Sequence, residues 1–319
     1  ARGTLKMNNI KKNIIQAHQR IEKHIHNTPI LSSQNINKIT GANIYFKCEN
    51  FQKIGAFKMR GALNAVFSYS KEKVKKGFVT HSSGNHAQAV ALSSKIAKTK
   101  AYVVMPKGSS TIKVNAVREY GGNITFCDNN EQSRVEMCDK IIKKTEANFI
   151  HPYNNYNVIY GQATCAKEIY ESKNFLDYII TPVGGGGLAS GTILATQAFS
   201  PLTKVVLAEP LNASDAFESF KSKKLIPVNN PNTIADGLKT SLGDKTFKII
   251  INGAHEVVTV TEKEIINSMK LIWERLKIIC EPSCSLPLAV VLKNRPKYQS
   301  KSVGLILTGG NVDLLNLPF

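Results

Sequence analysis

Cysteine is scarce in this sequence, and its placement gives no sign of a zinc finger. Only six cysteines occur among 319 residues. Cys280 and Cys284 lie close together, but no further pair of cysteines or histidines stands near them at zinc-finger spacing. We therefore expect reduced thiols and a cytoplasmic location.

The sequence also lacks the long apolar runs of a secretory signal or a membrane span. Residues 1–20 are basic and contain no such run. The stretch 178–203 carries no charge, but it contains four consecutive glycines, two prolines and several Ser and Thr residues. That composition favours a strand, a loop and a helix over a membrane span, so we expect no membrane partner.

Acidic residues are few relative to basic ones, which gives a formal net charge of +19. A basic nucleic-acid-binding protein is one interpretation. However, the basic residues are spread along the chain, with a modest cluster at Lys71, Lys73, Lys75 and Lys76, and no known nucleic-acid-binding module appears. A lysine-rich solvated surface is the better interpretation, and we expect no nucleic-acid partner.

Strand-like apolar runs alternate with helical patterns along the chain. An amphipathic helix opens the fold, with Ile10, Ile14, Ala17, Ile21 and Ile25 at helical spacing. The predicted strands are Ile44–Lys47, Gly77–Thr80, Ala101–Met105, Asn123–Cys127, Tyr178–Val183, Val205–Ala208, Val257–Val260 and Val303–Leu307. This alternation predicts an α/β protein with mostly parallel, open sheets covered by helices on both faces.

The length suits two such domains, and no tandem repeat or low-complexity linker interrupts the chain. We expect a large cofactor-binding domain from residues 1–66 and 154–319 and a small domain from residues 67–153. A ligand is then expected between them, beyond the carboxyl ends of the strands.

Lys58, in the segment Gly55-Ala56-Phe57-Lys58-Met59-Arg60-Gly61, is the leading candidate for chemistry. A lysine that is desolvated beside Phe57 favours the neutral amine that forms a Schiff base with an aldehyde. Most lysines are merely solvated surface charges, so this segment alone is moderate evidence.

The second motif is the run Gly184, Gly185, Gly186 and Gly187 after a predicted strand. Glycines let backbone N–H groups approach a phosphate, and the following helix adds its positive end. A tight turn is the alternative, although a turn seldom needs four glycines. No Walker lysine is present and the spacing does not fit G-x-G-x-x-G, so nucleotide-binding motifs are disfavoured.

Two further polar turns follow predicted strands. The segment Ser82, Ser83, Gly84, Asn85 and His86 reads as an anion cradle for a substrate carboxylate, or as a plain helix cap. Thr308, before Gly309-Gly310-Asn311, can offer its hydroxyl to a pyridine nitrogen.

Together these motifs resemble the fold-type II pyridoxal-phosphate enzymes, with a tryptophan synthase β-like fold. Within that group the chain is most similar to the serine racemase and serine/threonine dehydratase family, and closest to the racemases. The resemblance runs from Thr28-Pro29-Ile30-Leu31 to Asn311-Val312-Asp313-Leu314. It implies a pyridoxal-phosphate enzyme that racemises serine and removes ammonia from serine or threonine, and it suggests a homodimer and a nucleotide effector.

The resemblance also implies residue roles. Lys58 carries the cofactor as a Schiff base, Asn85 meets the ring hydroxyl, and Ser83 lies on the face opposite Lys58. The implied cofactor-binding residues are Phe57, Lys58, Asn85, Gly184, Gly185, Gly186, Gly187, Glu281 and Thr308, and the implied substrate-binding residues are Ser82, Ser83, Gly84, Asn85 and His86.

A divalent-cation site is implied as well. Glu209, Ala213 and Asp215 match the spacing of the racemase site, and two carboxylates with a backbone carbonyl suit Mg²⁺ or Ca²⁺. Without the family match, an acidic helix start would be the better interpretation.

Some positions depart from the racemase pattern. Tyr153 stands where racemases often have Asn and resembles the aromatic residue of dehydratases, and Thr308 replaces a more usual Ser. A threonine/serine dehydratase with little racemisation therefore remains the main alternative.

Overall fold

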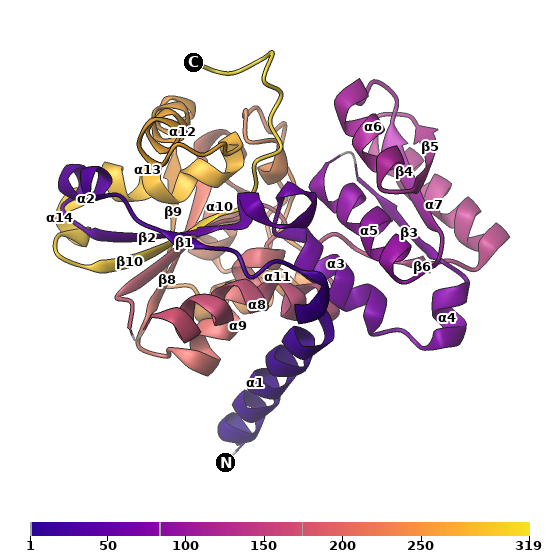
Figure 1. The fold of residues 1–319 in the computed structure, drawn as a ribbon, viewed down its shortest axis with the longest axis horizontal. Helices are drawn as coiled ribbons and strands as arrows, with labels where there is room; N and C mark the ends of the chain where they lie inside the picture. Colours follow the sequence, from indigo (N-terminus) through magenta and orange to yellow (C-terminus); the bar gives the residue numbers. More distant parts are fainter. Residues whose placement is uncertain (1, 83, 174) are drawn as a thin grey trace.

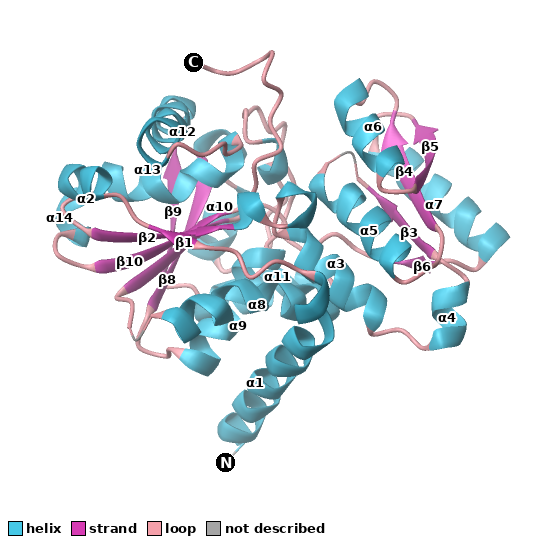
Figure 2. Ribbon diagram, in the orientation of Figure 1, coloured by secondary structure: helices cyan, strands magenta, loops and turns pink. Residues whose placement is uncertain are grey.

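The computed structural model describes residues 2–82, 84–173 and 175–319, and it contains two β-sheets with helices packed around them (Figures 1 and 2). The larger sheet has the strand order β1-β2-β10-β7-β8-β9. Its strands are β1 Ile30–Leu31, β2 Asn43–Cys48, β7 Tyr178–Pro182, β8 Lys204–Pro210, β9 Glu256–Val260 and β10 Ser302–Leu307. Strand β1 is antiparallel to β2 and the other pairings are parallel, so the sheet is mostly parallel.

Helices cover both faces of this sheet. Successive residues of a strand point to opposite faces, and in this sheet the residues on both faces are buried beneath helices. Ile180 and Leu305 pack in the core beneath one set of helices, whereas Ile179 and Ile306 pack beneath the other. The first set comprises α2 Gln34–Thr40, α12 Glu262–Leu276, α13 Leu286–Lys293 and α14 Arg295–Tyr298. The second comprises α1 Arg2–Ile21, α8 Tyr156–Ser172, α9 Gly187–Phe199, α10 Asp215–Ser222 and α11 Asp244–Gly253.

The smaller sheet is parallel and has the order β5-β4-β3-β6. Its strands are β3 Phe78–His81, β4 Ala101–Pro106, β5 Gly122–Cys127 and β6 Asn148–Phe149. Helices α5 Asn85–Ile96 and α6 Thr111–Glu119 cover one face, and α7 Glu131–Thr145 covers the other. Helices α3 Lys58–Phe67 and α4 Lys71–Lys75 connect the chain of β2 to β3. Six short 3₁₀ turns complete the described structure: η1 Glu22–His24, η2 Glu49–Phe51, η3 Lys53–Gly55, η4 Leu211–Ala213, η5 Asp236–Leu238 and η6 Pro282–Ser285.

Local sequence signals set several helix ends. Thr261 caps α12 by accepting a hydrogen bond from Glu264 N at 3.2 Å, and Glu264 Oε2 accepts one from Thr261 N at 2.8 Å. Gly41 ends α2 with a φ of 75°, in the left-handed region that favours glycine. The sequence therefore specifies these boundaries without help from distant residues.

The α/β class predicted from sequence is confirmed. All eight predicted strands are present, and their ends differ from the prediction by at most two residues. The prediction omitted β1 and β6, each two residues long, which are too short to produce a periodic pattern. No helix in the described ranges combines the length and the apolar character that crossing a bilayer requires.

Candidate functional site

The predicted functional turns gather where parallel strands end. Strands β2, β10 and β7 are neighbours, and the chain leaves their carboxyl ends toward Lys58, Thr308 and the glycine loop respectively. Neighbouring parallel strands deliver their following loops to one edge of the sheet, where ligands bind in open α/β proteins. The backbone joins two of these turns directly, because Phe57 N donates to Thr308 O at 3.0 Å and Ala56 forms a bridge with Gly309.

Lys58 is the first residue of α3, and its amine is directed at a backbone carbonyl. Lys58 Nζ donates to Pro152 O at 2.9 Å and lies 5.3 Å from the centroid of the Phe57 ring. Burial lowers the pKa of the Lys58 ammonium to about 8. Near neutral pH the neutral, nucleophilic amine is therefore far more populated than in a solvated lysine, although it is still the minor form.

The glycine loop connects β7 to α9 and leaves no room for side chains. Gly186 has a φ of 92° and stands at the N-terminus of α9. A Cβ at Gly185 would lie 2.2 Å from Tyr153 Cδ1, and a Cβ at Gly187 would lie 3.0 Å from Tyr153 Cβ. The loop therefore presents backbone N–H groups and a positive helix end, which together can bind a phosphate.

Thr308 supplies a buried hydroxyl beside this edge. Its side chain is only 4% exposed, and Thr308 Oγ1 has no hydrogen-bond partner within the described residues. A buried hydroxyl without a partner is costly, so an acceptor or donor supplied by a ligand would stabilise it.

Asn85, at the start of α5, connects the two sheets through hydrogen bonds. Asn85 Nδ2 donates to Glu281 Oε1 at 3.1 Å, and Asn311 Nδ2 donates to Asn85 Oδ1 at 2.8 Å. Burial raises the pKa of the Glu281 carboxyl to about 7, although the Asn85 amide opposes the shift. Glu281 thus approaches its neutral form at physiological pH.

The other residues of the Ser82–His86 segment lie around the N-terminus of α5. Gly84 N donates to Ser82 Oγ at 3.2 Å. His86 is buried, with its Nε2 3.2 Å from Ile150 O, and burial together with Lys58 lowers its pKa well below the usual range. Ser83 lies outside the described residues. The roles predicted for this segment remain predictions.

The two predicted metal-binding carboxylates lie beside each other in the interior. Glu209 lies within β8 and Asp215 begins α10, and they are 1% and 4% exposed. Glu209 accepts hydrogen bonds from Ala216 N and Phe217 N at 2.9 and 2.8 Å, and Asp215 accepts one from Leu242 N at 3.1 Å.

Burial and mutual repulsion act on the ionisation of this pair. The pKa of Glu209 is raised well above its usual range, by burial first and then by the charge of Asp215, and burial raises that of Asp215 to about 6. Within the described ranges, no cluster of three or more His, Cys, Asp or Glu side chains is arranged to hold a metal. A cation here would therefore need a backbone oxygen, such as the Ala213 carbonyl, as a third protein ligand.

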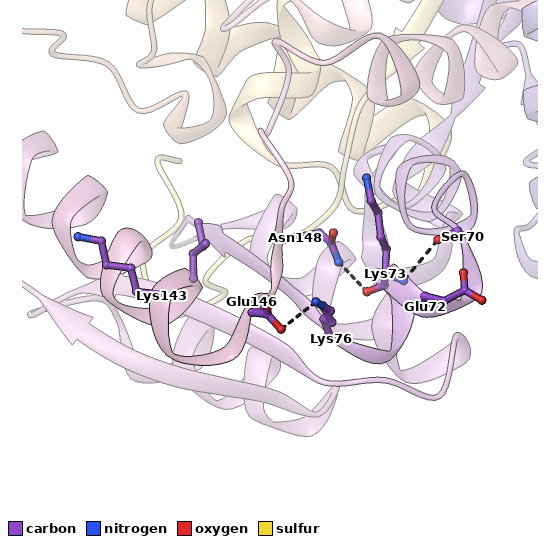
Figure 3. Close-up of a pocket in the computed structure, with 8 residues that line it drawn as sticks. Ser70, Glu72, Lys73, Lys76, Lys143, Glu146 and Asn148 are labelled. Carbon is purple, nitrogen blue, oxygen red and sulfur yellow. Dashed lines mark hydrogen bonds and ion pairs between the residues drawn. The ribbon is translucent and has the colours of Figure 1, made fainter.

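A surface cavity of about 610 Å³ is lined by residues of α4 and of the end of α7 (Figure 3). Its lysines have structural explanations. Lys73 and Lys143 stand in the last turns of α4 and α7, where positive charge offsets the negative helix end, and Lys76 pairs with Glu146 at 2.8 Å. None of the predicted site residues lines this cavity, so it is not the predicted cofactor site. Its lining residues are Ser70, Glu72, Lys73, Lys76, Ile142, Lys143, Glu146 and Asn148.

Sequence reasoning missed two contributors to the site. The Pro152 carbonyl is a backbone group, so its contact with Lys58 has no sequence signal. Asn311 was part of a predicted turn but had no predicted role, although Asn311 Nδ2 also donates to Ile54 O at 2.7 Å. Its link to Asn85 depends on how the two sheets are placed, which the local pattern does not reveal.

Comparison with known proteins agrees with this geometry. The model of the pyridoxal-phosphate dependent enzyme family matches residues 21–309. Serine racemase from Dictyostelium discoideum is 48% identical over 96% of both chains, and its crystal structure superposes with a TM-score of 0.91 over 95% of this chain and 99% of that chain.

Two further relatives bear other activity names. The beta-hydroxyaspartate dehydratase of Paracoccus denitrificans (strain Pd 1222) is 46% identical over 97% of this chain and 98% of its own. The crystal structure of a threonine deaminase from T.th. is 34% identical in sequence, with a TM-score of 0.91 over 95% of this chain and 98% of that chain. The resemblance predicted from the four motifs, including the fold type, is confirmed: this chain belongs to the family of pyridoxal-phosphate dependent enzymes.

Proposed function

We propose that this enzyme is a serine racemase that also removes ammonia from L-serine and L-threonine by β-elimination. The observation that carries the proposal is the Lys58 amine, whose pKa is lowered to about 8 among the turns that follow β2, β7 and β10. Relatives named serine racemase and beta-hydroxyaspartate dehydratase support both outcomes, since each relative is similar over nearly its whole length.

The described residues fit pyridoxal phosphate. The loop of Gly184, Gly185, Gly186 and Gly187 offers N–H groups for the phosphate, and a side chain at Gly185 would collide with Tyr153. Thr308 Oγ1 is buried without a partner among the described residues and would meet the ring nitrogen. Lys58 would hold the cofactor aldehyde through its amine, beside Phe57. Asn85, which donates to Glu281, would bind the ring hydroxyl, and Glu281 would contribute to the cofactor site.

When bound, pyridoxal phosphate supplies an electron sink that stabilises negative charge at the α-carbon of an amino acid. Lys58 would remove the α-proton as a neutral amine, and its lowered pKa favours that form. Ser83 would return a proton from the opposite face, which inverts the configuration.

The remaining side chains would orient the substrate. Ser82, Ser83, Gly84, Asn85 and His86 would hold the substrate carboxylate at the N-terminus of α5, where the helix end favours an anion. Loss of the β-hydroxyl as water after the same proton removal would instead release an enamine, which water hydrolyses to a keto acid and ammonia. One common proton-removal step therefore explains both activities.

We also propose that Glu209, Asp215 and the Ala213 carbonyl bind Mg²⁺ or Ca²⁺ outside the catalytic centre. The two buried carboxylates would repel each other if both were ionised, and a divalent cation would offset that repulsion. Glu209 lies in β8 and Asp215 begins α10, whereas Lys58 and Thr308 follow β2 and β10. The cation would therefore stabilise the large sheet without touching the substrate.

We propose a large domain of residues 1–66 and 154–319 and a small one of residues 67–153, a division supported by the two sheets. We further propose a cytoplasmic homodimer with a nucleotide effector and no nucleic-acid or membrane partner. The six cysteines, all within the described residues, are free and buried, which supports a reducing compartment.

The main alternative is a threonine/serine dehydratase with little racemisation, and Tyr153 favours it. Its ring packs on the glycine loop, at a position where racemases often carry Asn. Product assays with L-serine, D-serine and L-threonine decide between the two functions. D-serine formation from L-serine supports the racemase, whereas pyruvate and 2-oxobutanoate without D-serine support the dehydratase.

A further inference from the structure

Arg60, two residues after Lys58, is fully buried and makes hydrogen bonds with all three of its guanidinium nitrogens. Arg60 Nε donates to Glu49 Oε1 at 2.8 Å. Arg60 Nη1 and Nη2 donate to Glu168 Oε1 and Oε2 at 2.9 and 2.7 Å, and Nη1 also reaches Thr164 Oγ1 at 3.1 Å. The guanidinium therefore forms a bidentate pair with Glu168 and a second ion pair with Glu49.

The partners of Arg60 come from two other elements of the fold. Glu49 begins η2, directly after β2, while Thr164 and Glu168 lie on α8. Lys47, on β2, adds a further cation, because its Nζ lies 2.7 Å from Glu168 Oε2. We call Lys47, Glu49, Arg60 and Glu168 the buried ion cluster. It joins α3, β2 and α8 at one point.

Helices α3 and α8 also approach each other closely beside this cluster. Gly61 N donates to Gln162 Oε1 at 3.0 Å, and Asn64 Nδ2 donates to Asn157 O at 2.6 Å. A Cβ added at Gly161 would lie 2.5 Å from Arg60 O. The backbones therefore touch, and α3 cannot shift along α8 without breaking these contacts.

The same arrangement bears on the amine of Lys58. Successive helical residues are about 100° apart, so Lys58 and Arg60 project from nearly opposite sides of the first turn of α3. Pro152 O, the acceptor of Lys58 Nζ, belongs to the segment that leads into α8. Helix α8 thus carries Glu168, which binds Arg60, and it follows the segment whose Pro152 carbonyl accepts from Lys58.

We propose that Arg60 is a positioning residue for the reaction: its bonds to Glu168 and Glu49 fix the first turn of α3 against α8 and so hold the Lys58 amine in its reactive place. The inference rests on the proposed role of Lys58. It requires the planar fork of arginine, because a lysine at position 60 can supply the charge but not the bidentate pair together with the bond to Glu49.

The test compares Arg60→Lys with Lys47→Met in the full chain. Lys47 is also buried and belongs to the same ion cluster, but none of the Arg60 hydrogen bonds involves Lys47, so its substitution removes none of them directly. Both substitutions are expected to lower the melting temperature, so stability alone does not discriminate. Two measurements that depend on Lys58 discriminate between the variants. The first is the rate at which cofactor-free protein combines with added pyridoxal 5'-phosphate, monitored by absorbance. The second is the turnover of L-serine.

For Arg60→Lys we expect reconstitution at least several-fold slower and kcat about tenfold or more lower, since small displacements of a reacting group cost up to about 100-fold in rate. The deuterium isotope effect on kcat with α-deuterated L-serine should rise, because proton removal by a displaced amine becomes more rate-limiting. Lys47→Met should match the wild type in reconstitution, kcat and isotope effect.

The outcomes separate this inference from the proposed function. Wild-type protein that never combines with the cofactor through Lys58 contradicts the role of Lys58 itself. Wild-type protein that does so, with Arg60→Lys equal to it in reconstitution and isotope effect, overturns the positioning role. If Arg60→Lys does not fold, Thr164→Val decides, because it removes only one neutral acceptor of Arg60. A smaller slowing of reconstitution supports the inference, and an unchanged rate contradicts it.

Discussion

Two groups of buried polar side chains adjoin the first turn of α3, and they differ in how their charges are balanced. In the buried ion cluster, the positively charged Arg60 forms ion pairs with the carboxylates of Glu49 and Glu168. These pairs offset the free-energy cost of burying the charges. On the Lys58 side, the amine donates to a neutral carbonyl, and Thr308 Oγ1 has no partner within the described residues. The first group pairs its charges internally, although Glu49 Oε2 has no hydrogen-bond partner within the described residues, whereas the Lys58 amine has only a neutral acceptor.

This difference in charge pairing distinguishes the buried ion cluster, which has a structural role, from the groups around Lys58, which can bind a ligand. A buried charge with an opposite partner remains ionised and fixed, whereas a buried group without one has a pKa displaced toward its neutral form. Lys58 and Glu281 show the second behaviour, with pKa values of about 8 and about 7. Glu209 and Asp215 show it as well, so that pair resembles a ligand site more than it resembles the ion cluster.

The largest effect is expected from removal of the Lys58 amine, which donates only to a neutral carbonyl within the described residues. Lys58→Ala should lower racemisation and elimination together by about 10³-fold or more, because in the proposed mechanism the same amine is both cofactor anchor and base. D-serine and pyruvate formed from L-serine measure the two reactions. Lys71→Ala, which removes an exposed lysine of α4, is the control and should be unaffected. Wild-type turnover by Lys58→Ala would refute the assignment.

Ser83→Ala should separate the two reactions. Elimination needs mainly the Lys58 amine, whereas racemisation also needs a proton from the opposite face, so the ratio of D-serine to pyruvate should fall about tenfold. Ser82→Ala is the matched control. Ser82 supports the turn by accepting from Gly84 N, so its loss should weaken substrate binding and leave the product ratio unchanged. An unaltered ratio in Ser83→Ala would show that Ser83 is only a cap or a carboxylate ligand.

The site could be predicted from the sequence because its motifs are local. The glycines 184–187, Lys58 and Thr308 each follow a strand with a clear apolar pattern, and parallel strands bring their following loops to one edge. The proposed metal-binding residues Glu209, Ala213 and Asp215 were recognisable only through the family spacing. Their burial and the coupling of their carboxylates required the structure.

The ion cluster could not be predicted in this way. Arg60 is a single arginine in a short helix, and such residues are usually exposed. Its burial depends on Glu168, which is 108 residues later in the chain, and on Gly161, which lets the two helices touch. Long-range pairing of this kind leaves no periodic signal. For the same reason the bond between Asn85 and Glu281 appears only when the two sheets are placed together.

Thr308 tests whether the unpaired hydroxyl is there for the cofactor. Thr308→Val keeps the shape of the side chain but removes the buried hydroxyl, so folding should be little affected or slightly improved, since an unsatisfied polar group is removed. Activity should fall about tenfold, because the ring nitrogen loses its partner. Thr308→Ser restores the hydroxyl and should return activity to within about twofold of wild type. Equal activity in the Val and Ser variants would contradict this role.

The smallest expected effect concerns the carboxylate pair, and its sign depends on pH. The pKa values of Glu209 and Asp215 in the cation-free fold are raised above their usual range, that of Asp215 to about 6. A group with a raised folded pKa stabilises the fold below its unfolded pKa, and that stabilisation is lost as pH rises through the folded value. Cation-free protein should therefore lose stability as the pH increases from about 4 to above 6.

A bound divalent cation should reverse this behaviour, because it stabilises the ionised carboxylates. Chelation is expected to lower the melting temperature by about 2–5 °C at pH 8 and by less at pH 5, with a parallel fall in activity but a retained cofactor absorbance. Glu209→Gln should abolish the chelator effect, whereas Glu218→Gln, which removes an exposed carboxylate of α10, should preserve it. If chelation leaves the melting temperature unchanged at both pH values, Glu209 and Asp215 serve only as acceptors for backbone N–H groups of α10 and of Leu242. That result would also weaken the case for a racemase over a dehydratase.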